Sequence, residues 1–106
     1  MILDKQAALE RIDHDQELYD EICGIFRDDV PRILIKLIEA FNEGDLQVAT
    51  RHAHSLKSAA ANIGASDLSE TARLTEHSFR SGDLKNIPTL LSEIRLNIER
   101  VLEVIT

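Results

Sequence analysis

The chain has 106 residues, a net charge of −7, and a composition that is 43% hydrophobic and 29% charged. These values predict a single soluble domain, residues 1–106, with its own hydrophobic core, and they exclude a disordered chain. No apolar run approaches the roughly 20 residues that cross a bilayer, no secretion signal opens the chain, and the lack of a basic tract argues against nucleic-acid binding.

The single cysteine bears on the cellular location of the protein, and the uneven distribution of charge bears on the character of its surface. Cys23 cannot form an internal disulfide, which agrees with a cytoplasmic location, although a longer parent chain could be membrane-attached. Residues 1–29 carry nine acids and three bases, a net charge of −6, whereas residues 30–106 carry ten acids and nine bases. The first quarter therefore predicts an acidic surface, most simply a solvated helix face, beside an almost neutral remainder.

The N-terminal part is predicted to form helices with short breaks, since the chain has four glycines, two prolines and no alternating β-branched run. A short helix is predicted over 4–11, capped by its first residue. Asp13, with Gln16 three residues later, resembles a capping box and starts a second helix. Residues 28–31 (Asp-Asp-Val-Pro) predict a break, followed by a helix over 30–43. The side chains expected to face inward are Ala8, Leu9, Ile12, Leu18, Ile22, Ile25, Phe26, Val30, Leu34, Leu37, Ile38 and Phe41.

Three further helices are predicted over 45–63, 66–81 and 86–105, with Asp45 and Ser66 as caps of the first two. Helices joined by such short loops pack antiparallel against their sequence neighbours. The sequence therefore predicts an all-α fold: an antiparallel up-down four-helix bundle, with additional N-terminal helices over one end or flank.

The helix over 45–63 has an unbroken apolar seam and a histidine on its opposite side. The seam residues recur at spacings of three and four: Leu46, Ala49, Ala53, Leu56, Ala60 and Ile63. At about 100° per residue, His54 points roughly 130° away from the centre of the seam and is expected in water. Most of its helical neighbours are small, and a neutral imidazole is nucleophilic. The pattern favours a reactive histidine approached by another macromolecule.

Residues 54–65, with the sequence HSLKSAAANIGA, resemble the signature of histidine-containing phosphotransfer (HPt) domains. That signature runs, in order, through a histidine, any residue, an apolar residue and a lysine. A glycine or serine follows, then a stretch of small residues and a final glycine. The resemblance extends to residues 7–12 and 68–72, and so covers nearly the whole chain. It implies a phosphorelay intermediate in two-component signalling: His54 accepts a phosphoryl group from a receiver-domain aspartyl phosphate and passes it to another receiver aspartate.

The resemblance also implies roles for residues around His54. Lys57 would stabilise charge on the phosphoryl group, Ser58 would leave room for the docking partner, and Gly64 would form the turn into the next helix. The implied docking surface comprises Thr50, Arg51, Ser58 and Ala61.

The resemblance further implies a polar side chain on the next helix that orients the imidazole through its other nitrogen. His54 lies ten residues before the turn at Gly64 and Glu76 lies twelve after it, so the two lie at similar heights on adjacent helices. Glu76 is therefore the orienting candidate, and Thr75 or Arg73 remain alternatives.

The implied partners are response-regulator receiver domains, whose acidic pockets would be attracted by Arg51 and Lys57. We expect Mg²⁺ to sit on the receiver and no cofactor or metal to be bound by this domain, because His52 and His54 lie on different helix faces. The chain has no Gly-rich phosphate loop, so we expect no autonomous kinase activity. We also expect a monomer.

Alternative interpretations stay open. The chain could be a free-standing relay protein, part of a hybrid sensor histidine kinase, the phospho-accepting N-terminal domain of a chemotaxis-type histidine kinase, or a non-catalytic helical adaptor that binds receivers. Among the other residues that could carry chemistry, His14 and His77 are expected at the surface, and Tyr19 and Cys23 between the N-terminal helix and the bundle.

Overall fold

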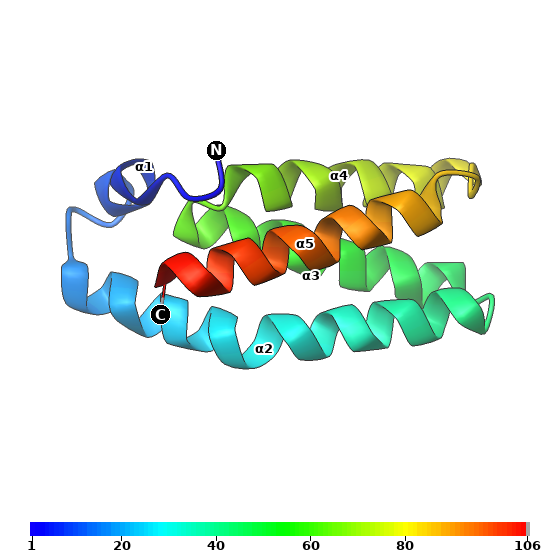
Figure 1. The fold of residues 1–106 in the computed structure, drawn as a ribbon, viewed down its shortest axis with the longest axis horizontal. Coiled ribbons are helices and arrows are strands. Elements are labelled where there is room, and N and C mark those ends of the chain that lie inside the picture. The colour runs from blue at the N-terminus through cyan, green and yellow to red at the C-terminus, as the bar shows by residue number, and fades with distance from the viewer. Residues whose placement is uncertain (106) are drawn as a thin grey trace.

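Helices dominate the fold in a computed structural model that describes residues 1–105 (Figure 1). They are α1 (Lys5–Glu10), α2 (Gln16–Asn42), α3 (Leu46–Ile63), α4 (Ser66–Ser81) and α5 (Ile87–Ile105). The molecule is elongated, with extents of 41 × 21 × 20 Å. Across residues 1–105, no helix combines the length and the apolar character that a membrane span requires.

The four long helices form the predicted antiparallel bundle. α2 runs the length of the molecule, α3 returns along it, α4 reverses again, and α5 closes the bundle by packing between α4 and α2 (Figure 1). α5 therefore lies on the opposite side of the bundle from α3. The short helix α1 contacts α3 and α2 near the α3–α4 turn, which confirms the expectation that N-terminal structure covers one end.

The core forms where the apolar stripes of the helices meet. Along α3 the predicted seam is confirmed: Leu46 is partly buried, and the other five seam residues have no exposed surface (Ala49, Ala53, Leu56, Ala60 and Ile63). α4 and α5 contribute Leu68, Ala72, Thr75, Phe79, Ile87, Ile94, Ile98 and Val101. Because the apolar face of α3 packs against the other helices of the bundle, the opposite face of α3 lies in solvent.

The predicted break at residues 28–31 is wrong, because α2 continues through Pro31. Acids before a proline are a common helix start, and proline costs roughly 3 kcal/mol inside a helix. Here Phe26, Val30 and Leu34 are buried at a spacing of four along one face. Burial of this continuous stripe on both sides of the proline outweighs the local signal and keeps one long helix.

Two predicted caps are also wrong. Asp13 has φ of +55°, a left-handed conformation, so it lies in the α1–α2 turn and Asp15 caps α2 by accepting a hydrogen bond from the Leu18 N–H. The residue before α4 is Ala65, which has no capping side chain, and Ser66 is already helical. Pro88 lies in the first turn of α5, where a proline is tolerated.

Two side chains expected to face inward from α2 are exposed: Leu18 at 39% and Ile25 at 60%. Leu18 directly precedes the buried Tyr19, and Ile25 directly precedes the buried Phe26. Because successive residues are rotated by about 100° around the helix axis, burial of the aromatic residue turns its predecessor towards solvent. The predicted burial of Tyr19 and Cys23 is confirmed, and the Tyr19 hydroxyl donates to the Ile63 carbonyl oxygen at 2.8 Å.

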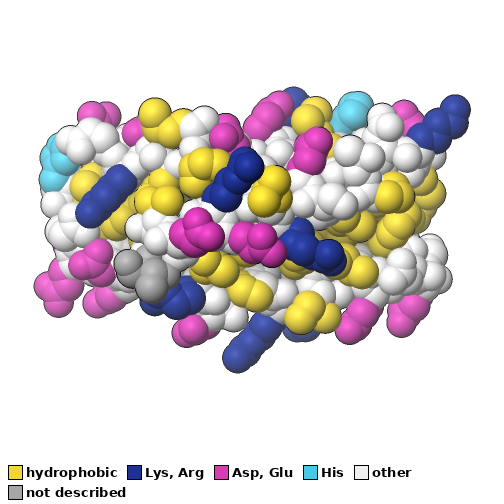
Figure 2. Space-filling model, viewed as in Figure 1, with side chains coloured by type: hydrophobic (Ala, Val, Ile, Leu, Met, Phe, Trp, Pro, Cys, Tyr) yellow, Lys and Arg dark blue, Asp and Glu magenta, His cyan; other side chains and the backbone are white. Residues whose placement is uncertain are grey.

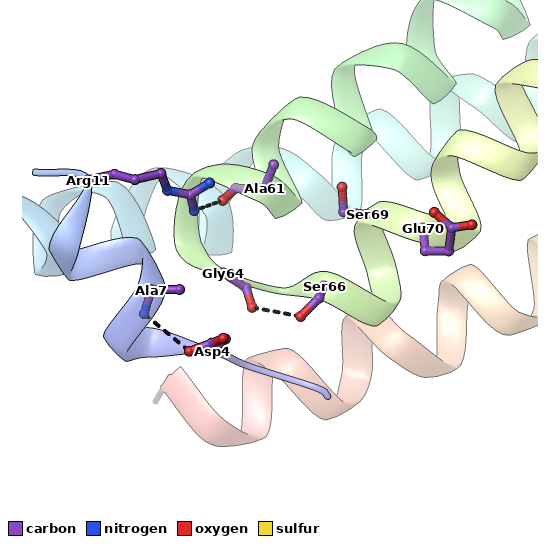
Figure 3. A pocket seen from close by; sticks show the side chains of 8 residues that line it. All are labelled: Asp4, Ala7, Arg11, Ala61, Gly64, Ser66, Ser69 and Glu70. Carbon is purple, nitrogen blue, oxygen red and sulfur yellow. Dashed lines mark hydrogen bonds between the residues drawn. The ribbon is translucent and has the colours of Figure 1, made fainter.

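At the turn between α3 and α4, the ends of these two helices meet the N-terminal segment around Asp4 (Figure 3). Gly64 has φ of +82°, as predicted for the residue that ends α3, and its carbonyl oxygen accepts a hydrogen bond from the Asp4 N–H at 2.7 Å. A Cβ atom at Gly64 would overlap the Asp4 carbonyl oxygen. Glycine is therefore required both for the turn and for the close approach of the N-terminal segment.

Candidate functional site

The His54 ring lies outside the core on the exposed face of α3. Its side chain is 55% exposed, whereas Leu56, two residues away, has no exposed surface. This placement follows from the seam, because packing the seam against the bundle turns His54 towards solvent. A second protein can therefore reach the ring without any change in the core.

Glu76 of α4 contacts three basic side chains from two helices. Its carboxylate is 8% exposed; Oε2 accepts hydrogen bonds from His54 Nδ1 at 3.1 Å and Arg80 Nη2 at 2.8 Å, and Oε1 lies 2.9 Å from Lys57 Nζ. Packing of α3 against α4 brings residues 22 positions apart into contact. The pairing of His54 with Glu76 is the geometry that the hairpin register indicates.

The charges around Glu76 set the protonation of both partners. Burial alone raises the pKa of the carboxyl group, but hydrogen bonds from Lys57, Arg80 and His54 outweigh it and lower the pKa to about 2. Glu76 is therefore ionised at neutral pH and only accepts hydrogen bonds. It follows that Nδ1 carries the proton in the neutral imidazole, and that Nε2 keeps the lone pair.

The alternative orienting residues make other contacts. Thr75 is fully buried and its hydroxyl donates to the Thr71 carbonyl oxygen at 2.8 Å. Arg73 forms an exposed two-bond ion pair with Glu70, at 2.6 and 2.8 Å. Glu76 is thus the side chain that the structure brings to His54.

Arg80 is a member of this cluster that sequence reasoning missed. It lies in the last turn of α4, four residues after Glu76, and its side chain is 65% exposed. Residues four apart share a helix face, so the contact between Arg80 and Glu76 could be predicted once Glu76 was a candidate. Arg80 also lines a shallow pocket of about 360 Å³ beside His54.

The implied docking residues spread along one side of α3. Thr50 and Arg51 line the pocket with His54, and Ser58 is exposed one turn further on. Ala61 is half-buried, and its carbonyl oxygen accepts a hydrogen bond from Arg11 at 2.5 Å in a second pocket at the α1 end (Figure 3). The first three flank the imidazole directly, whereas Ala61 belongs to the edge that α1 covers.

The remaining histidines lie apart from this cluster. His14 and His77 are exposed, as predicted. His52 is half-buried on another face of α3, where burial, followed by the charges of Lys36 and Arg51, lowers its pKa. Within residues 1–105 no three His, Cys, Asp or Glu side chains are grouped so that they could hold a metal ion.

The chain is similar to known phosphotransfer proteins in both sequence and fold. The family model of the Hpt domain matches residues 21–104. The crystal structure of histidine-containing phosphotransfer protein B (HptB) from Pseudomonas aeruginosa PAO1 matches with a TM-score of 0.88 and 26% identity, over 97% of this chain and 90% of that chain. No curated protein matches the chain. Since the family model spans most of the sequence, including α3 and α4, the chain belongs to the Hpt domain family of two-component phosphorelays.

Proposed function

We propose that this Hpt domain relays phosphoryl groups between receiver domains through His54. The observation that supports the proposal most directly is the imidazole: it is exposed, and its Nδ1 is held by a buried, ionised carboxylate. Such a ring presents Nε2, with its lone pair, to an incoming partner.

In the proposed transfer, Nε2 of His54 attacks the phosphorus of an aspartyl phosphate on a docked receiver. The N–P bond forms, the P–O bond to the aspartate breaks, and the aspartate leaves as a carboxylate. Nδ1 keeps its proton throughout, so the product is a phosphorylated imidazolium. The reverse attack by the aspartate of a second receiver completes the relay.

Glu76 and Lys57 support this chemistry in different ways. Glu76 fixes the ring orientation and stabilises the positive charge that the imidazolium gains. Lys57 lies one helical turn from His54 and supplies positive charge near the phosphoryl oxygens, while its ammonium group also pairs with Glu76. Gly64 positions α4, and therefore Glu76, against α3.

The proposed partner is a response-regulator receiver, which brings its own Mg²⁺ in an acidic pocket. Arg51, Thr50 and Ser58 surround the imidazole and form the centre of the proposed docking surface, with Ala61 at its edge. The domain acts as a monomer in this scheme, because the receiver needs the face of α3 that carries His54.

The test is radiolabel transfer from a panel of phosphorylated receivers to the domain and then to a second receiver. We expect His54→Gln to abolish acid-labile, base-stable phosphate on the domain, with an unchanged helical circular dichroism spectrum because the side chain lies outside the core. The matched control is His77→Gln, an exposed histidine on α4, which we expect to accept phosphate normally. Unchanged labelling of the His54 variant would overturn the proposal.

The same assay separates the alternatives. Phosphate received from a chemotaxis-type kinase core with ATP, and from no receiver, would indicate the N-terminal domain of such a kinase. Receiver binding without any transfer would indicate an adaptor.

A further inference from the structure

The pocket beside His54 is lined by groups that suit an anion. Its volume is about 360 Å³, and its lining residues are Thr50, Arg51, His54, Ser55 and Arg80. Two arginines, one histidine and two residues with hydroxyl groups thus line this space, and the lining includes no carboxylate. Since a water molecule takes up roughly 30 Å³ in the liquid, the pocket has room for a phosphoryl group and several waters.

The two hydroxyls of the pocket are already engaged as donors. Thr50 Oγ1 donates to the Leu46 carbonyl oxygen at 2.6 Å, and Ser55 Oγ donates to the Arg51 carbonyl oxygen at 3.1 Å. A hydroxyl has a single hydrogen, so neither can donate to an anion without losing this bond. The donors available to an anion in the pocket therefore come from Arg51 and Arg80.

Arg80 is the partner of Glu76 that can leave at the lowest cost. Glu76 Oε2 accepts from both Arg80 and His54, and Oε1 pairs with Lys57. The Arg80 side chain is 65% exposed, against 31% for Lys57, so water replaces its contacts readily. If Arg80 moves away, Glu76 keeps one partner on each oxygen, and no buried charge is left unpaired.

We infer that Arg80 exchanges partners when the domain is phosphorylated: it binds Glu76 in the free domain and the phosphoryl oxygens on Nε2 of phospho-His54 in the pocket, alongside Arg51. This inference rests on the proposed function and adds no bond-forming step to it. Lys57 stays on Oε1 of Glu76, while Glu76 keeps the imidazolium proton of His54. The exchange moves one positive charge from the carboxylate to the new dianion as that dianion arrives.

A guanidinium group suits this exchange better than an ammonium group. It carries five N–H donors in a planar fork, and two parallel hydrogen bonds to phosphoryl oxygens are a common geometry. The structure uses Nη2 of Arg80 for Glu76. A lysine at the same position would supply the charge without the fork, so it should replace Arg80 only in part.

The test follows the phosphoryl group itself by ³¹P NMR. The domain is phosphorylated chemically with phosphoramidate, which requires no receiver, and the signal missing from His54→Gln identifies phospho-His54. A nearby cation favours the dianionic phosphoryl group. We therefore expect Arg80→Gln to raise the pH midpoint of its titration by about one unit, a tenfold weaker preference for the dianion. Arg80→Lys should fall between the two.

The matched control is Arg95→Gln, an exposed arginine on α5 on the opposite side of the bundle, which should titrate as the unmodified protein does. A second readout is the ¹⁵N shift of the Arg80 Nε–H group, which should change on phosphorylation while that of Arg73, paired with Glu70, should not. If Arg80→Gln titrates like Arg95→Gln, or if the Arg80 shift stays constant, the exchange is wrong.

The two proposals fail separately. If no receiver phosphorylates His54, the relay function fails whatever the NMR titration shows. If receivers phosphorylate His54 and Arg80→Gln still matches its control, only the role of Arg80 fails.

Discussion

At the scale of single residues, the site depends on one buried carboxylate. Glu76 accepts hydrogen bonds or ion pairs from Lys57 and His54 on α3 and from Arg80 on its own helix. An unpaired carboxylate at that depth would be protonated or would destabilise the fold. The same contacts that orient the imidazole therefore also join α3 to α4.

This pairing predicts a pH-dependent stability. The pKa of Glu76 is about 2 in the folded domain against an ordinary 4.5, so the unfolded chain takes up its proton first as the pH falls. The contribution of Glu76 is complete above about pH 5 and is lost as the pH falls towards 2. A difference of about 2.5 pKa units, at roughly 1.4 kcal/mol per unit, gives a contribution on the order of 3–4 kcal/mol. Urea unfolding at pH 6, 4 and 2.5 measures it.

Glu76→Gln should remove most of this dependence, because the amide does not titrate. The control is Glu70→Gln, which removes an exposed carboxylate paired with Arg73 on the same helix and should change the pH profile far less. Equal pH profiles for the two variants would mean that the Glu76 cluster does not hold the fold.

Some residues of this site can be predicted from the sequence, and others cannot. The exposure of His54 is predictable from the seam, since six apolar positions define the direction opposite to it, whereas its role as phosphoacceptor is implied by the resemblance to HPt domains. Glu76 is predictable only as one of three candidates, because a rotation of α4 by one residue exchanges it with Thr75. The contact between Arg80 and Glu76 is predictable from their spacing of four once Glu76 is chosen, whereas the position of Arg80 beside His54 depends on how α3 packs against α4.

At the scale of elements, the helices follow from periodicity, and the errors lie where local signals compete with packing. Asp4 and Asp45 cap their helices as predicted, because a side chain that accepts from the third N–H after it is a local interaction. Pro31 was expected to begin a helix and instead lies within one. Its cost is local, whereas the burial that offsets it involves distant parts of the chain.

Alanine substitution should destabilise the domain more at Gly64, in the α3–α4 turn, than at other glycines with a positive φ. Gly64→Ala should cost roughly 1–2 kcal/mol for its left-handed backbone and about 1–3 kcal/mol more for overlap with the Asp4 carbonyl oxygen. Urea unfolding gives the total. Hydrogen exchange should show faster exchange in α1, because the variant cannot keep the Asp4 N–H bond to Gly64 in place.

Two glycines provide the control for the backbone cost alone. Gly44 and Gly82 have φ of +76° and +77°, and a Cβ atom at either would meet nothing within 4 Å. Their alanine variants should lose only the first part of the free energy and leave exchange in α1 unchanged. If all three variants are equally destabilised, the close approach of the N-terminal segment contributes nothing.

At the scale of the whole molecule, charge is distributed so that the histidine face differs from the acidic end. Asp and Glu side chains gather at the lower left of Figure 2, around the first turns of α2, in keeping with the net charge of −6 predicted for residues 1–29. The surface around His54 instead carries Arg51, Lys57 and Arg80. A net acidic protein thus carries a local basic surface around His54, which suits the acidic pocket of the proposed receiver partner.

This arrangement predicts that charge acts mainly on the rate of receiver association. Charges at the edge of an interface steer the encounter and are screened by salt, with a Debye length of about 8 Å at physiological ionic strength and 3 Å at 1 M. Arg51→Glu should therefore slow association with a receiver that phosphorylates His54 by roughly tenfold at low salt, and the difference should shrink at high salt. Arg95→Glu makes the same change in net charge on the far side of the bundle, so it should have little effect. Stopped-flow association at 0.05 and 0.5 M NaCl measures both. If the two variants slow association equally, net charge alone would account for the attraction, and the basic surface around His54 would have no steering role.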